Sequence, residues 1–562
     1  MVVWPRYRVA VAPGKMMKSF SFRPVLLALL AALILHLVLV QPNHPAAMAW
    51  DALLLFPLEL PAIILALIAL GSGRGGWLAR IVLVAALALI ATLKFADYVM
   101  FTSLNRGFNP VSDLPLVASL YDLIVGTVGR AAAIAAGGLF IIAVIGLVAV
   151  LWWSCRVWSR MPRPFIVARL AAVAAIATAG LAIADIGQKM GRWSLPYKLP
   201  ATAFSARVGV ERVAMAQRTF VDLQAFRQAA KEDPFANQPN LFDLVDRDVL
   251  IVFVESYGRT SLDTPFYADL HRATLAQAEE ELQDLGLSMA STLLQSPTKG
   301  GQSWLAHATF ANGLWIDNQT AYGAALNSGR QTLYHLAATA GFHTAAVMPQ
   351  ITLDWPEAQF MGFDKILAAK DLGYEGLPFN WITMPDQFTF AAMDRLLSPT
   401  VPEGARSFTQ MALGSSHAPW VPVPSLLDWD ALGDGTVFNP VVTASDTPRV
   451  VWKDHDRVRD QYKLAVDYAL QVVFAYAALH AADPPLMIVV GDHQAAGFIA
   501  LDERPHVPMH IIGPAHLVDA LADAQFDPGL IPDNVTEIRS MSDMRAHLLQ
   551  SLSSETLAVA TP

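Results

Sequence analysis

Five apolar runs dominate the first 200 residues of the chain. They cover residues 25–40, 52–71, 77–100, 131–153 and 165–184. Each run is close to the ~20 residues that a helix needs to cross ~30 Å of hydrocarbon. The pattern therefore predicts a five-helix transmembrane domain over residues 1–184.

Beyond this region the apolar pattern changes twice. Over residues 185–240, apolar positions such as Val208, Val213 and Phe220 recur near helical spacing among arginines, which predicts a connector with a juxtamembrane helix. From residue 241 onward, short β runs alternate with helical stretches. The predicted strands are 249–254, 289–294, 344–348, 408–413, 487–490 and 509–512, and the predicted helices are 266–284, 304–313, 331–340, 385–397, 457–481 and 541–552. This alternation predicts an α/β domain over 241–562, with a largely parallel sheet covered on both faces.

Charge separates the two halves of the 562-residue chain. Residues 1–200 hold 17 basic and 6 acidic residues, a net charge of +11, and the remainder holds 22 and 42, a net charge of −20. A disordered chain, a disulfide scaffold and a basic nucleic-acid binder are excluded, so no nucleic-acid partner is expected. The single cysteine, Cys155, lies in the first half. The α/β domain therefore has neither a disulfide nor a thiol nucleophile.

Basic residues lie in alternate loops between the apolar runs. One set of loops holds eleven: Arg6, Arg8, Lys15, Lys18, Arg23, Arg74, Arg80, Arg156, Arg160, Arg163 and Arg169. The opposite set holds three: Lys94, Arg106 and Arg130. By the positive-inside rule the N-terminus is cytoplasmic, and five spans then place the α/β domain outside the cytoplasmic (inner) membrane. Within the second run, Glu59 between Pro57 and Pro61 is either functional or reaches to the membrane surface.

Two apolar strands end in side chains that bind metals. Strand 249–254 runs directly into Glu255, and strand 487–490 runs through Gly491 into Asp492 and His493. Ligands in such sheets bind beyond the carboxyl ends of the strands. Carboxylate with imidazole suits Zn²⁺ or Mn²⁺ and, with more oxygen ligands, Mg²⁺. These residues predict a site for one divalent cation.

A hydroxyl and a histidine follow two other strands. After the strand ending at Leu294, a loop with two glycines leads to Ser303, where a helical run begins. A serine in that place either caps the helix or, beside a metal, acts as a nucleophile. We favour the nucleophile, with Thr298, Thr260 and Ser261 as rival hydroxyls. His417 follows strand 408–413 in Gly414-Ser-Ser-His-Ala-Pro, where it either contacts substrate or serves the structure.

These motifs, in this order, resemble lipoteichoic acid synthase and the phosphoglycerol transferases of the alkaline phosphatase/sulfatase superfamily. The resemblance rests on Glu255, Gly-Gly-Gln-Ser303, Ser-His417-Ala-Pro and Gly-Asp492-His493, with a Gly-Phe-Asp-Lys turn at 362–365. Five spans before an extracytoplasmic domain also match that family. The resemblance covers nearly the whole chain.

The resemblance implies roles for individual residues. One cation, often manganese, is held by Glu255, Asp492 and His493 together with the nucleophile, Ser303, and His417 contacts the substrate. Phosphoglycerol transferases often read Trp-Asn-Arg where this chain reads Trp355-Pro-Glu357, so an arginine expected to pair with glycerophosphate is replaced by a carboxylate. Trp355 remains a candidate substrate contact. Lys299 is the candidate for the missing positive charge, and a solvated lysine is the alternative.

The function expected is a membrane-anchored, metal-dependent transferase. It would move a phosphoglycerol-type unit from a phospholipid to an envelope glycan or lipid acceptor through a phosphoserine. The alternatives are a phosphoethanolamine transferase, a sulfatase-like phosphodiesterase, and a non-catalytic envelope protein. The sulfatase branch fits less well because Ser303-Trp-Leu-Ala-His lacks the proline and arginine of its Cys/Ser-x-Pro-x-Arg motif.

Overall fold

The computed structural model describes residues 22–104, 106–196 and 201–554, and the chain divides into two compact units. The first unit consists of residues 1–98 and 124–213, and the second of residues 99–123 and 214–562. Arg6, Arg8, Lys15 and Lys18, which contribute to the predicted orientation, lie outside the described residues.

Within the described part of the chain, the first unit has four helices long and apolar enough to cross a membrane. They are α1 (Phe22–Val40), α3 (Arg74–Leu104), α5 (Arg130–Ser159) and α6 (Phe165–Lys189). The predicted second span instead divides into a short turn, Trp50–Leu54, and helix α2 (Glu59–Leu70). Twelve residues span about 18 Å at 1.5 Å per residue. The helix begins only after Pro57, because proline disfavours helical geometry in the residue before it. Among the described residues, the structure therefore has four helices of full spanning length and not the five predicted.

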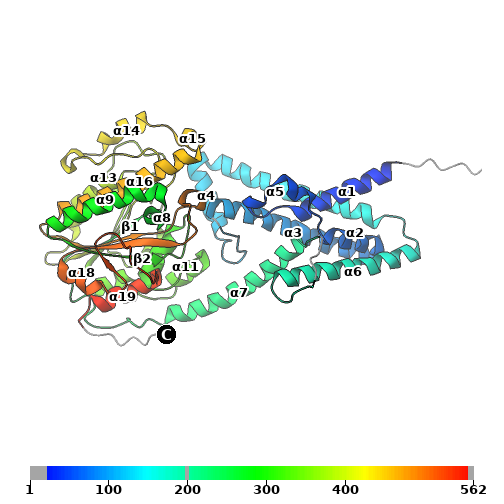
Figure 1. Ribbon diagram of the computed structural model, residues 1–562, viewed down its shortest axis with the longest axis horizontal. Coiled ribbons are helices and arrows are strands. Elements are labelled where there is room, and N and C mark those ends of the chain that lie inside the picture. The colour runs from blue at the N-terminus through cyan, green and yellow to red at the C-terminus, as the bar shows by residue number, and fades with distance from the viewer. Residues whose placement is uncertain (1–21, 105, 197–200, 555–562) are drawn as a thin grey trace, which may run out of the picture. The chain divides into compact units, whose positions relative to one another are not determined.

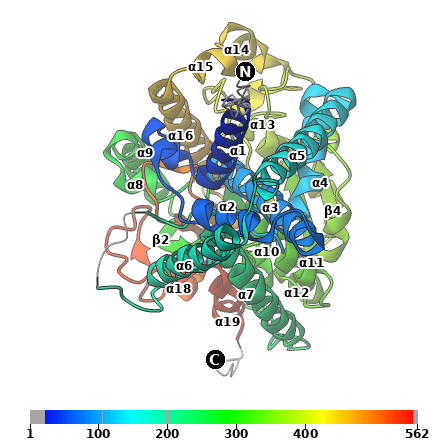
Figure 2. The same cartoon turned by 90° about the vertical axis from the view of Figure 1, so that its right-hand side faces the viewer.

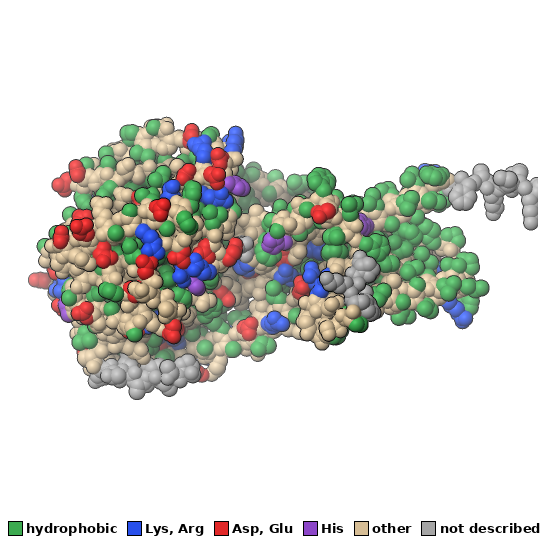
Figure 3. Space-filling view, viewed as in Figure 1, with side chains coloured by type: hydrophobic (Ala, Val, Ile, Leu, Met, Phe, Trp, Pro, Cys, Tyr) green, Lys and Arg blue, Asp and Glu red, His purple; other side chains and the backbone are tan. Residues whose placement is uncertain are grey.

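The surface of these helices suits lipid rather than water. Leu139 on α5 is 69% exposed and Ile176 on α6 is 74% exposed. Figure 3 shows hydrophobic side chains covering the long helices of this unit, whereas acidic and basic side chains gather over the second unit. An apolar surface of this extent marks a contact with membrane.

Charged groups inside the first unit are paired with backbone or with one another. Lys94 of α3 donates to the Leu39 carbonyl and to Ser205 Oγ, both at 2.9 Å. Arg212 of α7 (Ser205–Lys231) contacts Asp97 at 2.6 Å. Glu59 is buried, and its Oε1 accepts from the Ala206 N–H at 3.0 Å. Glu59 therefore binds the backbone at the first turn of α7 from a buried position.

The second unit is built on a nine-stranded sheet (Figure 1). The strands are β1 (Val249–Val254), β2 (Ser288–Gln295), β3 (His343–Met348), β4 (Lys365–Ala368), β5 (Ser407–Ala412), β6 (Leu486–Gly491), β7 (His506–Gly513), β8 (Asp527–Pro528) and β9 (Arg539–Ser540). Their order is β4-β3-β5-β1-β6-β7-β2-β8, and β9 pairs with β2. The six predicted strands are all present. Three short ones, β4, β8 and β9, were not predicted.

Both faces of the sheet are covered, as predicted. Along β1, Leu250, Val252 and Val254 join one buried cluster, and the residues between them join the other, as strand pleating requires. The first cluster includes α9 (Pro265–Asp284), α13 (Asp386–Leu397) and α16 (His455–Leu479). The second includes α10 (Ser303–Asn312), α12 (Leu333–Thr339), α18 (Ala515–Leu521) and α19 (Met544–Ser551). Figure 1 shows α9 and α16 on one side of the sheet and α18 and α19 on the other, and Figure 2 labels α10 and α12.

Shorter helices of this unit lie in its connections. They are α4 (Leu116–Val128), α8 (Thr260–Asp263), α11 (Gln319–Leu326), α14 (Asn439–Ala444), α15 (Pro448–Val451) and α17 (Gly497–Ala500).

Strand direction brings the loops that carry chemistry to one edge. Strands β1, β3, β4, β5 and β6 are parallel. Strand β7 is antiparallel to both β6 and β2. Two reversals restore the direction, so β2 ends at the same edge as β1 and β6. The helix after β2 can therefore meet the residues that follow β1 and β6.

Candidate metal centre and nucleophile

Glu255 and Asp492 are neighbours because of strand register. Val254 at the end of β1 pairs with Gly491 at the end of β6, so the two following carboxylates emerge side by side. Gly491 cannot be replaced without movement, because a Cβ there would lie 1.9 Å from the Tyr257 carbonyl oxygen. The backbone of one strand end thus packs directly on the chain that follows the other.

The acidic pair and His493 form a compact, buried group. One ligand atom from each of Glu255, Asp492 and His493 lies within 4.8 Å of the others. His493 Nε2 is 3.3 Å from Glu255 Oε1. His493 Nδ1 lies 3.0 Å from the Gln494 carbonyl, which can only accept, so Nδ1 keeps its proton and Nε2 is the nitrogen that would give up its proton to bind a metal. Loss of that proton leaves the tautomer that a metal ligand requires.

Backbone amides fix the orientation of Asp492. Its Oδ1 accepts from the Ser256 N–H at 2.8 Å and from the His493 N–H at 2.6 Å. Ser256, which donates the first of these bonds, adopts a left-handed conformation, φ 58°. Such strained backbone occurs often at functional sites.

The charges in this group need a cation beside them. Burial, with the Glu255 carboxylate close by, raises the pKa of Asp492 to about 8. Burial also opposes ionisation of Glu255, but His493 and His417 outweigh it and hold the pKa of Glu255 below its ordinary value. Burial lowers the pKa of His493, but Asp492 and Glu255 together raise it to about 9. Because one cation would relieve the repulsion between the two carboxylates, the three residues fit a divalent metal.

Ser303 lies within hydrogen-bond reach of this group. It is the first residue of α10, after a loop in which Gly300 (φ 75°) and Gly301 (φ 139°) make the turn. Its Oγ donates to Glu255 Oε2 at 2.8 Å and lies 3.2 Å from His493 Nε2. The rival Thr298 hydroxyl donates instead to the Gly301 carbonyl, within the turn. Of these two hydroxyls, Ser303 is the one described in contact with the acid–imidazole group, and Thr298 bonds within the turn.

His417 belongs to the same edge of the sheet. It follows β5, its Nδ1 lies 2.6 Å from the Ala418 carbonyl, and its ring is close enough to contribute to lowering the pKa of Glu255. The carbonyl fixes the proton on Nδ1, which leaves Nε2 for a substrate. His417 also lines a cavity of about 500 Å³ together with the tryptophans Trp381 and Trp452.

Lys299 and Trp355, the other two candidate substrate residues, each contact a further side chain. Lys299 pairs with Glu503 at 2.5 Å. The Trp355 ring lies 6.3 Å from the Phe363 ring. The structure thus brings together Glu255, Ser303, Asp492 and His493, with His417 nearby.

Two residues of this region were not predicted. His307 lies one turn after Ser303, against Phe253 with ring centroids 4.1 Å apart, and burial lowers its pKa to about 4. Its i, i+4 spacing from Ser303 was the available sequence signal. Asp386 of α13 accepts from the Gly414 and Ser415 N–H groups at 2.7 and 2.9 Å and so holds the loop before His417. Nothing in the local sequence marks Asp386.

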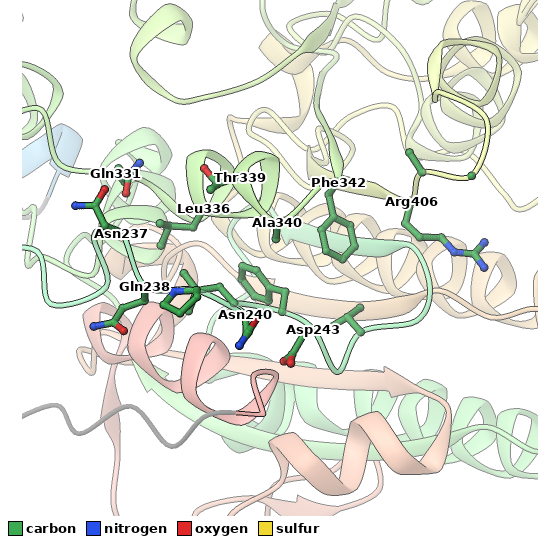
Figure 4. A pocket seen from close by; sticks show the side chains of 17 residues that line it. Asn237, Gln238, Asn240, Asp243, Gln331, Leu336, Thr339, Ala340, Phe342 and Arg406 are labelled. Atoms are coloured by element: carbon green, nitrogen blue, oxygen red, sulfur yellow. The ribbon is translucent and has the colours of Figure 1, made fainter.

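A second cavity, of about 510 Å³, lies at the opposite edge of the sheet (Figure 4). Phe342 and Arg406, which line it, immediately precede β3 and β5. It is therefore separate from the residues that follow the carboxyl ends of the strands.

No protein-family model and no curated protein matches the chain. Among solved structures, it is similar to the integral membrane lipooligosaccharide phosphoethanolamine transferase A from Neisseria meningitidis, with 13% identity and a TM-score of 0.46 over 94% of this chain and 96% of that one. The lipoteichoic acid synthase LtaP from Listeria monocytogenes shows 14% identity and a TM-score of 0.37 over 60% of this chain and 80% of that one. The phosphoglycerol transferase GacH of Streptococcus pyogenes, in complex with sn-glycerol-1-phosphate, shows 15% identity and a TM-score of 0.35 over 60% of this chain and 82% of that one.

The last two are a lipoteichoic acid synthase and a phosphoglycerol transferase, the classes that the motifs resemble. The predicted resemblance is confirmed to that extent, as a likeness between chains.

Proposed function

We propose that this protein is a membrane-anchored, metal-dependent phosphotransferase that moves a phosphoglycerol-type unit from a phospholipid to an envelope glycan or lipid acceptor. The observation that carries the proposal is the Ser303 hydroxyl, 2.8 Å from Glu255 and 3.2 Å from His493 in a buried acid–imidazole group. A serine hydroxyl at the edge of a cation site is the arrangement for covalent phosphoryl transfer.

The residues of the chain account for both halves of the transfer. Ser303 Oγ loses its proton along the hydrogen bond to Glu255 and bonds to phosphorus, while the bond from phosphorus to the diacylglycerol oxygen breaks. His417 enters this step as an imidazolium, with a proton on each ring nitrogen, and its Nε2 gives a proton to that leaving oxygen. In the second half, the acceptor hydroxyl gives a proton to His417 and bonds to phosphorus. The Ser303–phosphorus bond then breaks, and Oγ regains its proton from Glu255.

A divalent cation held by Glu255, Asp492 and His493 would supply charge stabilisation for the alkoxide and for the phosphoryl oxygens. Manganese is the first candidate, followed by Mg²⁺ and Zn²⁺.

A phosphoethanolamine transferase is the second candidate. Glu357 stands where phosphoglycerol transferases often have arginine, and a carboxylate suits an ammonium better than a glycerophosphate. Water as the acceptor would make the same site a phosphodiesterase.

The headgroup is tested by the mass added to Ser303. Purified protein is incubated with Mn²⁺ and, separately, with phosphatidylglycerol and phosphatidylethanolamine, quenched and digested, and the Ser303 peptide is weighed. We expect the phosphoglycerol adduct from the first lipid. An ethanolamine adduct alone would select the second candidate, and no adduct from either lipid, with both lipids intact, would contradict the phosphotransferase.

We further propose that the second unit lies outside the cytoplasmic membrane and that the N-terminus is cytoplasmic. The 11-to-3 bias of basic residues supports this orientation. It requires an odd number of crossings, so the segment from Trp50 to Leu70, including α2, would complete the fifth. Alkaline phosphatase fused after residue 240 should be active, because that reporter folds only outside the cytoplasm. An inactive fusion, with a cytoplasmic reporter active at the same point, would reverse the orientation.

A further inference from the structure

The residue before the nucleophile has a buried amide with an unused donor. Gln302 is 8% exposed and adopts a left-handed conformation, φ 66°, at the start of α10. Its Nε2 atom is buried and has no hydrogen-bond partner among the residues that the structure describes. Since buried polar groups are nearly always paired, this donor calls for an acceptor from outside the chain.

Arg106 determines which end of the Gln302 amide is left unpaired. Arg106 Nη2 donates to Gln302 Oε1 at 3.3 Å. A guanidinium can only donate, so the atom that faces it must be the amide oxygen. The NH₂ group is therefore the end turned away from Arg106, and its orientation does not depend on the choice of amide flip.

Arg106 is itself held in a fixed position. It makes a two-pronged contact with Asp113, at 2.7 and 2.9 Å, and the Asp113 side chain is fully buried. Asp113 Oδ2 also accepts from the Asn109 N–H at 2.7 Å, and Asn109 Nδ2 donates to Thr219 Oγ1 at 2.9 Å. The loop 106–113 thus holds Arg106 in place against Gln302, the residue before Ser303.

We infer that Gln302 is a further substrate-contacting residue: its Nε2 donates to a non-bridging oxygen of the phosphodiester attacked by Ser303, and Arg106 is the positioning residue that aims it. This inference rests on the proposed function. An amide N–H is a suitable donor to an oxygen that gains negative charge during phosphoryl transfer. Because non-bridging oxygens occur in every phosphodiester, Gln302 would serve transfer itself and would not select the headgroup.

The Arg106 charge is already matched by Asp113, so Arg106 is assigned to positioning and not to neutralising phosphate. The two roles predict different results for Arg106→Lys: a lysine would preserve charge neutralisation but not positioning. A lysine keeps the charge but cannot make the two-pronged contact that holds the donor in place.

The test uses the full chain in detergent with Mn²⁺ and two probes. Bis(p-nitrophenyl) phosphate reports turnover, and orthovanadate, a mimic of the five-coordinate phosphoryl group, reports binding by titration. We expect Gln302→Ala to lower kcat about 10²-fold with KM within threefold, and to weaken vanadate binding about tenfold. Metal content and Tm should stay at their wild-type values.

The positioning role is tested by Arg106→Ala, Arg106→Lys and the double variant. Both single variants should lower kcat about tenfold, and Arg106→Ala combined with Gln302→Ala should be no worse than Gln302→Ala alone. Arg272→Ala is the matched control. Arg272 makes the same two-pronged contact with Asp533, at 2.8 and 3.1 Å, and has the same 33% side-chain exposure, so its loss should leave kcat unchanged.

The outcomes separate this inference from the proposed function. Wild-type kcat and vanadate affinity in Gln302→Ala would overturn the donor, and additive losses or rescue by Arg106→Lys would overturn the positioning role. If wild-type protein binds vanadate but forms no lipid adduct, the proposed function fails and the vanadate titration still decides for or against Gln302. If it neither binds vanadate nor turns over the diester, both fail.

Discussion

Ser303→Ala should abolish both turnover and covalent labelling by a phospholipid donor. The variant removes a hydroxyl that contacts both Glu255 and His493, at 2.8 and 3.2 Å. Loss of a nucleophile that acts through a covalent intermediate costs several orders of magnitude, so we expect a fall in kcat of at least about 10³-fold. Turnover and the mass of the Ser303 peptide measure the two effects.

Two further variants make the nucleophile assignment specific. Ser303→Thr keeps the hydroxyl but adds a methyl group, so it should retain part of both turnover and labelling. Thr298→Ala removes a hydroxyl that already donates to the Gly301 carbonyl, so it should leave labelling intact apart from any loosening of the turn. Labelling that persists in Ser303→Ala and disappears in Thr298→Ala would move the nucleophile to Thr298.

Asp492→Asn should lower metal content together with activity. The amide is nearly the same size but cannot supply a negative ligand, and with its oxygen kept on the backbone donors that now bond to Oδ1, its NH₂ takes the place of Oδ2. The loss of metal affinity should exceed the roughly 10–100-fold that follows from removing an outer-shell partner. Metal per chain by elemental analysis, at fixed free Mn²⁺, measures it.

A buried carboxylate away from the site provides the control for Asp492→Asn. Asp467 of α16 is also buried and accepts from Thr274 Oγ1 at 2.5 Å and Gln471 Nε2 at 2.7 Å. Asp467→Asn should keep wild-type metal content. Full metal occupancy in Asp492→Asn would remove Asp492 from the set of ligands.

The strands of the second unit could be predicted because their sequences are short, apolar and rich in β-branched residues. Val249–Val254 is such a run, and the residues after it had to emerge at an edge of the sheet. The adjacency of Glu255 and Asp492 follows from the pairing of β1 with β6, which local sequence does not encode. The direction of β7 and its place between β6 and β2 were likewise beyond reach, because periodicity carries no information on strand direction.

Other features escaped prediction for physical reasons that differ. The length of the second span was overestimated because hydropathy averages across Pro57, whereas helix α2 begins only after that proline. The part played by Gln302 depends on Arg106, 196 residues earlier, and no local pattern connects them. The ion pair between Lys299 and Glu503 likewise joins residues about 200 positions apart, so local sequence does not reveal it.

The composition of the second unit has a consequence for biosynthesis. Residues 99–123 belong to it although they precede two long apolar helices, α5 and α6. Because the ribosome releases the chain from its N-terminus, loop 106–113 emerges before Thr219 and well before Gln302, its partners 110 and 196 residues away. The loop therefore lacks these two contacts until Thr219 and Gln302 have been synthesised. The contact between loop 106–113 and the residues around Ser303 therefore forms late, after α5 and α6 have been synthesised.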